Sequence, residues 1–466
     1  MASQIPEKIL KLARAIKSEG GRALLVGGCV RDVLLDQWPK DWDVEVYGVE
    51  PARLRELLEV FGPVNVVGEA FTVYKLGQDL DISLPRRERK QGRGHRGFII
   101  EGDPSMSVEE ATRRRDFTIN AILEDPLTGE LIDPYGGRAD LHRKLLRAVS
   151  RETFAEDSLR VLRAAQFAAR FEFEIETETI ELCRAIDLSD LARERVWAEM
   201  EKLLLRARRP SIGLKRLYEL GAVDQLFPEL KALVGVPQEY DWHPEGNCDV
   251  HTMLTADRAR ELIEDLPYPK QVAVMLGALC HDFGKPATTE FIEGRWRSRG
   301  HEEAGVGPTE SFLERLGLYT LEGYDVRAQV LALVRDHLKP GEFYNRRDEI
   351  GDGAFRRLAR RCELELLYRV ARADTLGRNA DWVPRERWSD AQPQEWFIER
   401  ARQLQVEQKP PAQILLGRHL LEMGLKPSPL VGRILQAVYE MQLDGRVSTL
   451  EEARAAAQSL LDQQDE

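Results

Sequence analysis

The sequence predicts a mixed α/β head followed by an elongated all-α body, which makes an α+β protein overall. Over the first 145 residues or so, short runs rich in β-branched residues alternate with segments of helical periodicity. From about residue 146 onward, Leu, Ala, Arg and Glu recur at three- and four-residue spacing, which is typical of amphipathic helices. With 466 residues the chain is too long for one hydrophobic core, so we expect two to four domains.

The head is predicted from four strands and a helix. "RALLVGG" and "DWDVEVYG" read as strands, and "EPARLRELLEVFG" from residue 50 to 62 reads as a helix that a glycine ends. "FTVYKLG" and "LDISLP" read as two further strands in a hairpin-like arrangement. We expect a head over 1–145, a helical neck over 146–237, a histidine-rich helical domain over 238–385 and a helical tail over 386–466.

Composition indicates a globular protein of the cytoplasm. Hydrophobic residues make up 43% and charged residues 31% of the chain, and no run of 18 apolar residues predicts a membrane span. The five cysteines have no paired spacing, and the first 20 residues read as a charged amphipathic helix rather than a signal peptide. The net charge of −12 argues against a nucleic-acid partner, but "RRERKQGRGHR" (86–96) and "RRR" (113–115) are strongly basic.

A double glycine and an Asp-x-Asp pair suggest a phosphate and metal site in the head. Gly27 and Gly28 end a strand where a helix begins, which suits close approach of a phosphate, although a purely structural turn explains them equally well. Asp41 and Asp43 are expected on one face of a strand, where Mg²⁺ between them would offset their repulsion. Asp81 is a candidate third ligand. A solvent-facing pair remains the alternative, and neither a Rossmann nor a P-loop spacing is present.

Four segments in order carry a family resemblance: GG-x-VRD, D-x-D, "RRDFTINA" and "DPYGG". Together they resemble the class II tRNA nucleotidyltransferase and bacterial poly(A) polymerase family. The resemblance implies a nucleotidyltransferase palm in which Asp41, Asp43 and Asp81 are catalytic and the first two hold Mg²⁺. It also implies that the incoming nucleotide is bound by Gly27, Gly28, Arg31, Asp32, Arg115, Asp116 and Asn120.

The predicted neck contains a candidate base-selecting row. Asp157, Arg160 and Arg163 are three apart, which places them on one face of a helix; a surface ladder of ion pairs is the alternative. Glu156, Asp157 and Arg160 match the E-D-x-x-R motif of the same family. The match implies that these three side chains select CTP and ATP without a nucleic-acid template, and Asp157, Arg160 and Arg163 are expected to bind the nucleotide. It further implies that Arg86 and Glu88 form a loop pair that switches the site from C to A.

The histidine-rich region predicts a second site. His251, the adjacent His281-Asp282 pair and Asp374 fall on separate predicted helices, a donor set that suits Mn²⁺, Ni²⁺ or Zn²⁺. Their order resembles the HD phosphohydrolase superfamily. The resemblance implies further contacts from His301 and His337 and a phosphate contact from Lys285. A degenerate domain kept for RNA binding is the alternative.

A nucleotidyltransferase head joined to an HD domain resembles the multifunctional CCA-adding family of bacteria. This implies addition of the 3′-terminal CCA to tRNA with CTP and ATP as substrates, and hydrolysis of 2′,3′-cyclic or 2′-phosphates at damaged RNA ends. The tail is expected to hold the acceptor and T arm of tRNA. No DNA and no membrane are expected as partners, and both a monomer and a homodimer remain open.

Three alternatives remain at this stage. The first is an A-adding enzyme that works with a separate CC-adding partner. The second is a metal-dependent phosphohydrolase whose head only holds RNA. The third, a non-catalytic RNA-binding protein, is disfavoured because both carboxylate sets are present. An intact E-D-x-x-R motif disfavours a plain poly(A) polymerase, and a full-length segment after residue 85 disfavours a CC-only enzyme.

Overall fold

The computed structural model describes residues 5–67, 73–90 and 98–463, without the side chains of 66, 67, 87–90 and 98–101. The chain divides into two compact units. Unit 1 contains residues up to 207 together with 212–226, and unit 2 contains residues 208–211 and 227 onward. The predicted α+β class, a sheet-containing head and a mainly helical body, is confirmed. The finer four-part division stays a prediction.

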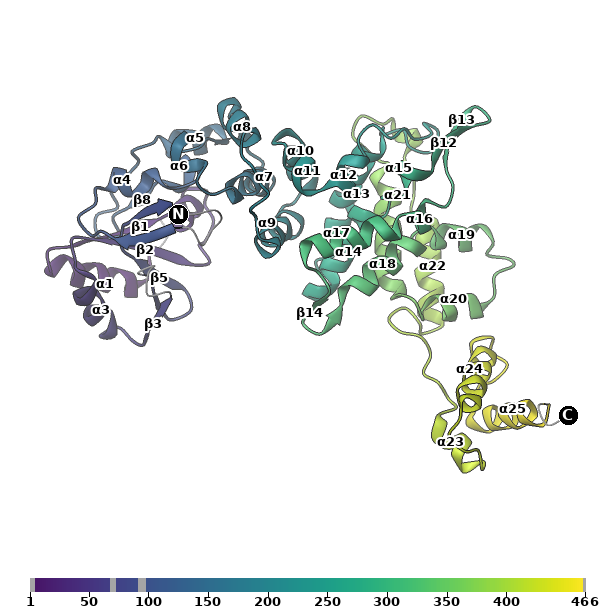
Figure 1. The fold of residues 1–466 in the computed structure, drawn as a ribbon. Coiled ribbons are helices and arrows are strands. Elements are labelled where there is room, and N and C mark those ends of the chain that lie inside the picture. The colour runs from purple at the N-terminus through teal and green to yellow at the C-terminus, as the bar shows by residue number, and fades with distance from the viewer. Residues whose placement is uncertain (1–4, 68–72, 91–97, 464–466) are drawn as a thin grey trace. The chain divides into compact units, whose positions relative to one another are not determined.

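A seven-stranded mixed sheet lies at the centre of unit 1 (Figure 1). Its strands lie in the order β3-β4-β5-β2-β1-β8-β9. Strands β2 and β5 are parallel, so Asp43 of β2 lies directly opposite Asp81 of β5, whereas the other neighbours are antiparallel. The strands are β1 (Arg22–Val26), β2 (Trp42–Tyr47), β3 (Val64–Val67), β4 (Val73–Leu76), β5 (Leu80–Ser83), β8 (Leu123–Glu124) and β9 (Leu131–Ile132).

Short helices flank the sheet. Helix α1 buries Ile9, Leu12, Ala13 and Ile16, a three- and four-residue spacing that gives it one apolar face. A two-stranded hairpin of β6 (Arg86–Lys90) and β7 (Phe98–Gly102) follows the sheet strand β5. The helices here are α1 (Glu7–Ser18), α2 (Gly28–Leu34), α3 (Pro51–Glu59), α4 (Val108–Arg113), α5 (Gly137–Arg143) and the 3₁₀ turn η2 (Thr118–Asn120).

The second half of unit 1 is helical, as the sequence predicts, with one difference. Helix α6 (Arg151–Phe154) ends before the E-D-x-x-R segment, and α7 (Leu159–Phe171) begins within it, so that Arg160 is helical and Asp157 is not. Asp157 therefore lies outside the helix, and the predicted single helical row of Asp157, Arg160 and Arg163 is wrong. The reason is local: the Asp157 carboxylate accepts the backbone N–H of Leu159 at 3.2 Å, which stabilises a turn before the helix. The remaining elements are β10 (Leu145–Leu146), β11 (Glu174–Ile175), α8 (Thr177–Arg184), α9 (Arg193–Arg206), α10 (Pro210–Glu219) and α11 (Ala222–Leu226).

Unit 2 is built around helix α14, of whose 13 residues ten are buried. Such a helix, apolar on all sides, belongs at the centre of a helical domain. Gly277 permits its close packing, because a Cβ there would lie 3.1 Å from Leu333 of α18 and Val370 of α21. The helices are α12 (Pro228–Ala232), α13 (Cys248–Glu261), α14 (Tyr268–Cys280), α15 (Lys285–Thr288), α16 (His301–Ala304), α17 (Val306–Leu316), α18 (Val326–Asp336), α19 (Lys339–Asn345), α20 (Asp352–Leu358), α21 (Leu364–Gly377) and α22 (Gln392–Gln403), with the 3₁₀ turn η3 (Arg385–Arg387).

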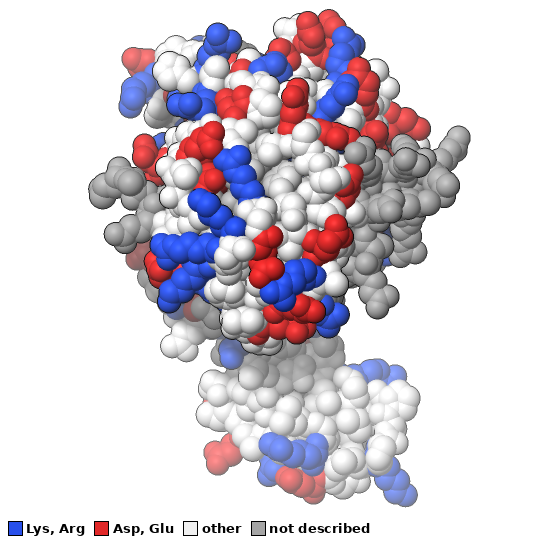
Figure 2. Space-filling model, turned by 90° about the vertical axis from the view of Figure 1, so that its left-hand side faces the viewer, with Lys and Arg blue, Asp and Glu red and all other residues white. Residues whose placement is uncertain are grey.

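Two short hairpins interrupt this helical body, which the sequence alone does not predict. They are β12 (Thr289–Ile292) with β13 (Arg295–Ser298), and β14 (Thr320–Leu321) with β15 (Tyr324–Asp325). The chain ends in α23 (Gly417–Glu422), α24 (Pro429–Leu443) and α25 (Leu450–Asp462), which share their own apolar core. In the part of the chain that the structure describes, no helix has the length and apolarity needed to cross a bilayer. Figure 2 shows Lys and Arg interspersed with Asp and Glu over the face in view, so no one sign of charge covers it.

Two candidate active sites

A cavity of about 520 Å³ in unit 1 collects most of the residues that the sequence predicts for the head site. Strand β2, strand β5 and the start of α7 contribute to its wall. The predicted residues that line it are Asp43, Asp81, Arg86, Arg115, Asp116, Glu156, Asp157, Arg160 and Arg163. Acidic side chains therefore meet a set of arginines in one hollow, as binding of a metal-bound anion requires.

Carboxylates gather on the sheet side of this cavity. Burial raises the pKa of Asp43, Arg115 lowers it, and the carboxylates of Asp81 and Asp41 raise it further. Asp81 is 3.4 Å from the ammonium of Lys75. Asp41 is exposed and immediately precedes β2, beyond the lining of the cavity. Neighbouring carboxylates that oppose one another's ionisation fit a divalent cation with oxygen ligands.

The backbone conformation and the close packing at position 27 require glycine. Its φ of +73° is unfavourable for other residues, and a Cβ would come within 2.9 Å of Arg115 Nη1 and 4.0 Å of Asp43 Oδ2. The strand-to-helix turn thus brings the backbone close to Arg115 and Asp43, which line the cavity. Gly28 is different, because a Cβ there would meet Arg31 Nη2 at 3.5 Å, an ordinary contact.

Arg31, Asp32 and Asn120 lie behind the cavity rather than in its wall. The Arg31 guanidinium donates to Asp32 Oδ1 at 2.6 Å and to Asn120 Oδ1 at 2.6 Å, and it is 4% exposed. It also lies 4.7 Å from the ring centroid of Phe171. These contacts tie α2 to η2 and α7, so in this structure the three residues support the site.

Asp116 is the point where the head and the neck helix α7 are joined. Its Oδ1 accepts from Asn120 Nδ2 at 2.9 Å, and its Oδ2 accepts from Arg163 Nε at 2.7 Å. Burial acts to raise the pKa of Asp116, but Arg163, Asn120 and Arg160 outweigh it and lower the pKa to about 2. Near neutral pH the ionised carboxylate of Asp116 holds Arg163 beside the cavity.

The residues predicted to read the base are engaged with protein partners. Arg195 Nη2 donates to both oxygens of Asp157 at 3.1 Å. Arg160 donates to the backbone carbonyls of Thr153 and Arg114, each at 2.5 Å. Asp157 and Arg160 are thus held by separate contacts at the cavity wall. The side chain of Glu88, the predicted partner of Arg86, lies outside the described residues.

Unit 2 brings all four core HD residues together, although they come from α13, the turn that follows α14, and α21. His251 Nε2 is 3.0 Å from Asp374 Oδ1 and 3.3 Å from His281 Nε2. His281 Nε2 is 3.2 Å from Asp282 Oδ2. His251, His281 and Asp282 are at most 1% exposed and Asp374 is 7% exposed. The predicted cluster is therefore a buried polar centre rather than a set of separate surface residues.

Backbone carbonyls orient three histidines of this centre for metal binding. His281, His301 and His337 each donate Nδ1–H to the carbonyl oxygen three residues earlier, at 2.6 to 2.7 Å. The other ring nitrogen, Nε2, therefore points into the centre, where those of His301 and His337 are 3.2 Å apart. Burial and the neighbouring imidazoles lower the pKa of His337 to about 3, so this histidine is neutral.

Asp282 lies between two groups of ligand atoms, the set of His251, His281 and Asp374 and the set with His301 and His337. Burial acts to raise the pKa of Asp282, but His281 and Lys285 outweigh it and hold the pKa well below its usual range. Lys285 Nζ is 2.8 Å from Asp282 Oδ2, while the buried Oδ1 has no hydrogen-bond partner among the described residues. The neutral imidazole of His337 and the carboxylate of Asp282, whose Oδ1 has no hydrogen-bond partner in the described part of the chain, are donors that fit a divalent transition metal.

Comparison with known proteins shows the family to which the chain belongs. A model of the poly A polymerase head domain matches residues 23–147, a model of the probable RNA- and SrmB-binding site of polymerase A matches 172–233, and the HD domain model matches 249–379. The multifunctional CCA protein of Xylella fastidiosa (strain M23) is 39% identical over 352 residues, which cover 73% of this chain and 79% of that protein. The chain belongs to the multifunctional CCA protein family.

The multifunctional CCA protein of Stenotrophomonas maltophilia (strain R551-3) is also similar, at 40% identity over 76% of this chain and 86% of that protein. Among solved structures, the fold resembles the CCA-adding enzyme of Bacillus stearothermophilus in complex with CTP, with a TM-score of 0.64 and 20% identity over 98% of both chains. It also resembles the Thermotoga maritima CCA-adding enzyme complexed with tRNA, with a TM-score of 0.57 and 20% identity over 98% of this chain and 97% of that one. Members of the nucleotidyltransferase and HD families generally use divalent metals.

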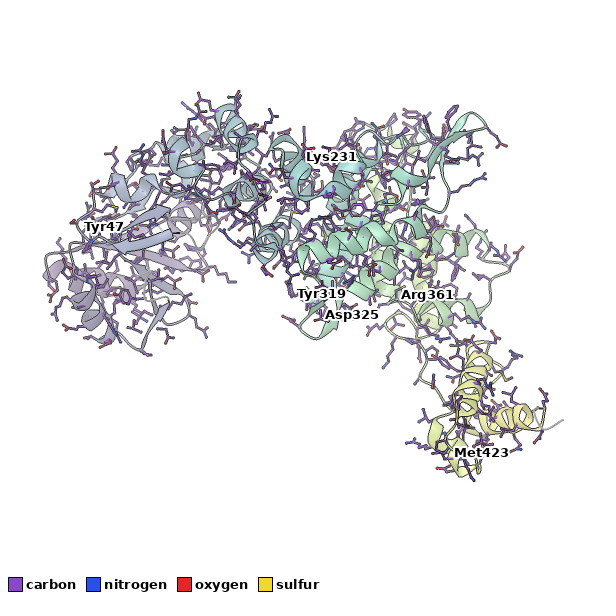
Figure 3. All side chains as sticks on the ribbon, in the orientation of Figure 1. Tyr47, Lys231, Tyr319, Asp325, Arg361 and Met423 are labelled. Carbon is purple, nitrogen blue, oxygen red and sulfur yellow. The ribbon has the colours of Figure 1, made fainter. Side chains whose placement is uncertain are left out.

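The structure adds residues that sequence reasoning missed in this family member. In the head cavity these are Glu45, Arg114 and Arg195. Glu45 is fully buried, accepts from Tyr47 (labelled in Figure 3) at 2.6 Å and pairs with Arg114 at 3.3 Å. The alternation of Asp41, Asp43 and Glu45 in the sequence was the available signal for Glu45.

The HD centre also has partners that the sequence reading omitted. Glu245 Oε1 lies 2.7 Å from His251 Nδ1 and 2.9 Å from His243 Nδ1. Glu245 therefore lies on the side of the His251 ring away from the other ligands, where it fixes the ring's orientation. The segment "WHPE" six to nine residues before His251 was the available signal.

Proposed function

We propose that this chain is a template-independent tRNA nucleotidyltransferase that builds the 3′-terminal CCA from CTP and ATP and releases pyrophosphate. The observation that carries the proposal is the head cavity, where carboxylates of β2 and β5 face arginines and Asp157 of the neck. The relatives named above are multifunctional CCA proteins, and the structural neighbours are CCA-adding enzymes bound to CTP or tRNA.

We assign metal and triphosphate binding to one wall of the head cavity and base selection to the other. Asp41, Asp43 and Asp81 would hold Mg²⁺, which neutralises triphosphate charge and activates the 3′-hydroxyl when bound. Arg115 and Arg163 approach the cavity as fixed cations for phosphate oxygens, and the Asp116 pair keeps Arg163 in place. We assign Gly27 and Gly28 to the turn that approaches the triphosphate, with Arg31, Asp32 and Asn120 supporting it.

Base selection is assigned to the opposite wall. A carboxylate and a guanidinium at fixed positions can present donors and acceptors to a base edge as a paired base would. Asp157 and Arg160 offer this combination, Glu156 lies beside them, and Arg86 of β6 is the candidate lever that changes the fit from C to A. Protein contacts already hold Asp157 and Arg160 near the cavity, which reduces the conformational entropy lost on binding.

Substitution of the carboxylates tests this assignment. Asp41→Ala and Asp43→Ala are expected to abolish nucleotide addition to a tRNA that lacks CCA while leaving tRNA binding largely intact, measured by gel extension and by filter binding. Arg14→Ala, an exposed ion-pair residue of α1, is the matched control and should extend tRNA normally. Retained addition in either aspartate variant would contradict the mechanism.

We propose in addition that the HD centre hydrolyses 2′,3′-cyclic phosphates or 2′-phosphates at RNA ends. His251, His281, Asp282 and Asp374 would hold Ni²⁺, Mn²⁺ or Zn²⁺, with His301 and His337 as further ligands; such a metal supplies hydroxide near neutral pH. Lys285 lies on the cavity side of Asp282 and offers its positive charge to a substrate phosphate. Hydrolysis of 2′,3′-cyclic AMP that depends on one of these metals and on His281 would support the assignment, whereas metal-independent hydrolysis would refute it.

The proposed activities imply a macromolecular partner and a cellular compartment. The tRNA 3′ end with its acceptor and T arm would be the macromolecular partner, and the helical tail is our candidate for that contact. Five buried cysteine thiols suit a reducing cytoplasm. The A-adding enzyme remains the rival within the family, and the phosphohydrolase with an RNA-holding head is the rival of another class.

A further inference from the structure

A second cavity leads from the HD centre to an exposed group of aromatic and arginine side chains. It has a volume of about 310 Å³, and three residues of the HD centre or its surroundings line it: His243, Lys285 and His301. Trp242 and Trp296 line the same cavity. The centre is therefore connected to the surface through a passage whose outer part is aromatic.

Hairpin β12–β13 provides one side of this passage. Trp296 lies directly opposite Phe291 across the hairpin, and their ring centroids are 5.1 Å apart in an edge-to-face arrangement. Glu293 and Gly294 have positive φ, which fits the tight two-residue turn of a well-defined hairpin. The N–H of Trp296 donates to Glu239 Oε2 at 3.1 Å, so the hairpin is fastened to the segment that carries Trp242.

These aromatic rings are exposed although burial would stabilise the fold. Trp242 is 49% exposed, Trp296 37% and Phe291 61%. The guanidinium of Arg295 is 5.9 Å from the Trp242 centroid. We call Trp242, Phe291, Trp296, Arg297 and Arg299 the tryptophan rim; both arginines line the cavity, and Arg299 has no ion-pair partner among the described residues. Exposed aromatic faces among arginines are typical of surfaces that bind single-stranded nucleic acid.

We propose that the tryptophan rim binds the unpaired 3′ end of an RNA and delivers its terminal phosphate to the HD centre. The terminal base stacks on Trp296 or Trp242, and Arg297 and Arg299 face the backbone phosphates. A cavity of about 310 Å³ is at the lower end for small-molecule sites and suits one nucleotide. Phe291 extends the aromatic surface beyond the cavity, which favours an RNA end over a free nucleotide. The identity of the reacting phosphate rests on the proposed phosphohydrolase function, whereas the binding does not.

Kinetics on two substrates test the rim. We expect Trp296→Ala and Trp242→Ala each to lower kcat/KM for a five-nucleotide RNA ending in a 2′,3′-cyclic phosphate by about 10-fold, within the range that loss of one base stack produces. Hydrolysis of bis(p-nitrophenyl) phosphate, which has no base, should not change. Tyr319→Ala is the matched control, because Tyr319 (labelled in Figure 3) is also exposed with an arginine, Arg327, 5.1 Å from its ring, but lies outside the cavity. Equal losses on both substrates, or undiminished RNA hydrolysis, would overturn the proposal.

A binding measurement separates the rim from the phosphohydrolase function. The full chain, without added metal, is photo-crosslinked to the same RNA carrying 4-thiouridine at its terminal position, and the crosslinked peptides are identified by mass spectrometry. Crosslinks in peptides covering 239–243 or 291–299 support the rim even if no metal restores hydrolysis, in which case the phosphohydrolase function alone fails. Crosslinks confined to unit 1 overturn the rim even if hydrolysis occurs. Equal kcat/KM for 2′,3′-cyclic AMP and the RNA would overturn the preference for an RNA end.

Discussion

The two sites differ most in how their charged groups are exposed to solvent. In the head, the side chains of Asp81 and Lys75 are 37% and 46% exposed, and Asp41 is exposed. In the HD centre, the four core residues are buried and their ligand atoms face one another within 4 Å. A buried charged cluster is costly without a counter-charge, whereas exposed carboxylates are solvated.

This difference in solvent exposure predicts how each site acquires its metal. We expect Mg²⁺ to enter the head together with a nucleoside triphosphate, because aspartates that are only half-buried or exposed bind it weakly alone. We expect the HD centre to hold a transition metal permanently, because its imidazoles are already oriented by backbone carbonyls. One chain would thus contain a transient and a resident metal site.

The largest expected effect separates the sites by activity. Asp282→Ala removes the carboxylate between the two ligand groups and should lower phosphohydrolase activity at least 100-fold. Nucleotide addition should stay within twofold of wild type, because the head cavity lies wholly in unit 1. Both rates are measured on the same preparation. A parallel loss of addition would mean that the two sites are coupled.

A metal titration of thermal stability compares the sites directly. At a concentration of Ni²⁺ or Mn²⁺ about 100 times its Kd, resident binding contributes about 2.7 kcal/mol, which corresponds to a rise in Tm of about 5 to 10 °C for a domain of this size. Mg²⁺ without nucleotide should produce no comparable rise. The Asp282→Ala variant should lose the transition-metal shift, measured as the difference between its own metal-free and metal-bound scans. Equal shifts with Mg²⁺ would contradict the distinction.

Arg195 offers a more subtle test of the head. Its guanidinium holds both oxygens of Asp157, so Arg195→Ala should leave that carboxylate poorly positioned and raise KM for CTP and ATP about tenfold. A purely structural effect of Arg195→Ala would not change which nucleotides are incorporated. Incorporation of UTP and GTP is therefore measured as well, and we expect it to increase relative to incorporation of CTP and ATP. Arg184→Ala, which removes a side-chain contact to the carbonyl of Glu219, is the control. Unchanged selectivity would refute the role of Arg195.

The smallest effect concerns acid stability. The pKa of Asp116 is about 2 in the folded protein and 3.8 in the reference state, so this carboxylate stabilises the fold above pH 4 and loses its contribution as pH falls toward 2. The free energy of unfolding is measured in urea for wild type and for Asp116→Asn. The difference between the two values should be constant from pH 7 to 5 and about 1 kcal/mol smaller at pH 3. A difference that grows at low pH would contradict the assigned direction.

The sequence predicted the fold class and most residues of the head cavity, because strand alternation and the order of the motifs can be read directly along the chain. It placed His281 and Asp282 at the end of an apolar helix, as the structure has them. It could not find Arg195, because this residue acts on Asp157 in another element through a contact that only folding creates. The error at Asp157 has the same origin, since a side chain that accepts from a nearby N–H ends the helical pattern that spacing alone suggests.

Extension of a tRNA that ends before its first terminal C tests the central claim most directly. The purified full chain is incubated with this tRNA and CTP alone, ATP alone, or both, and the 3′ ends are sequenced. The account predicts two added C residues with CTP alone, no efficient addition with ATP alone, and CCA with both. Addition of A only to a tRNA that already ends in CC would establish the A-adding rival, and no addition under any condition would contradict the nucleotidyltransferase function.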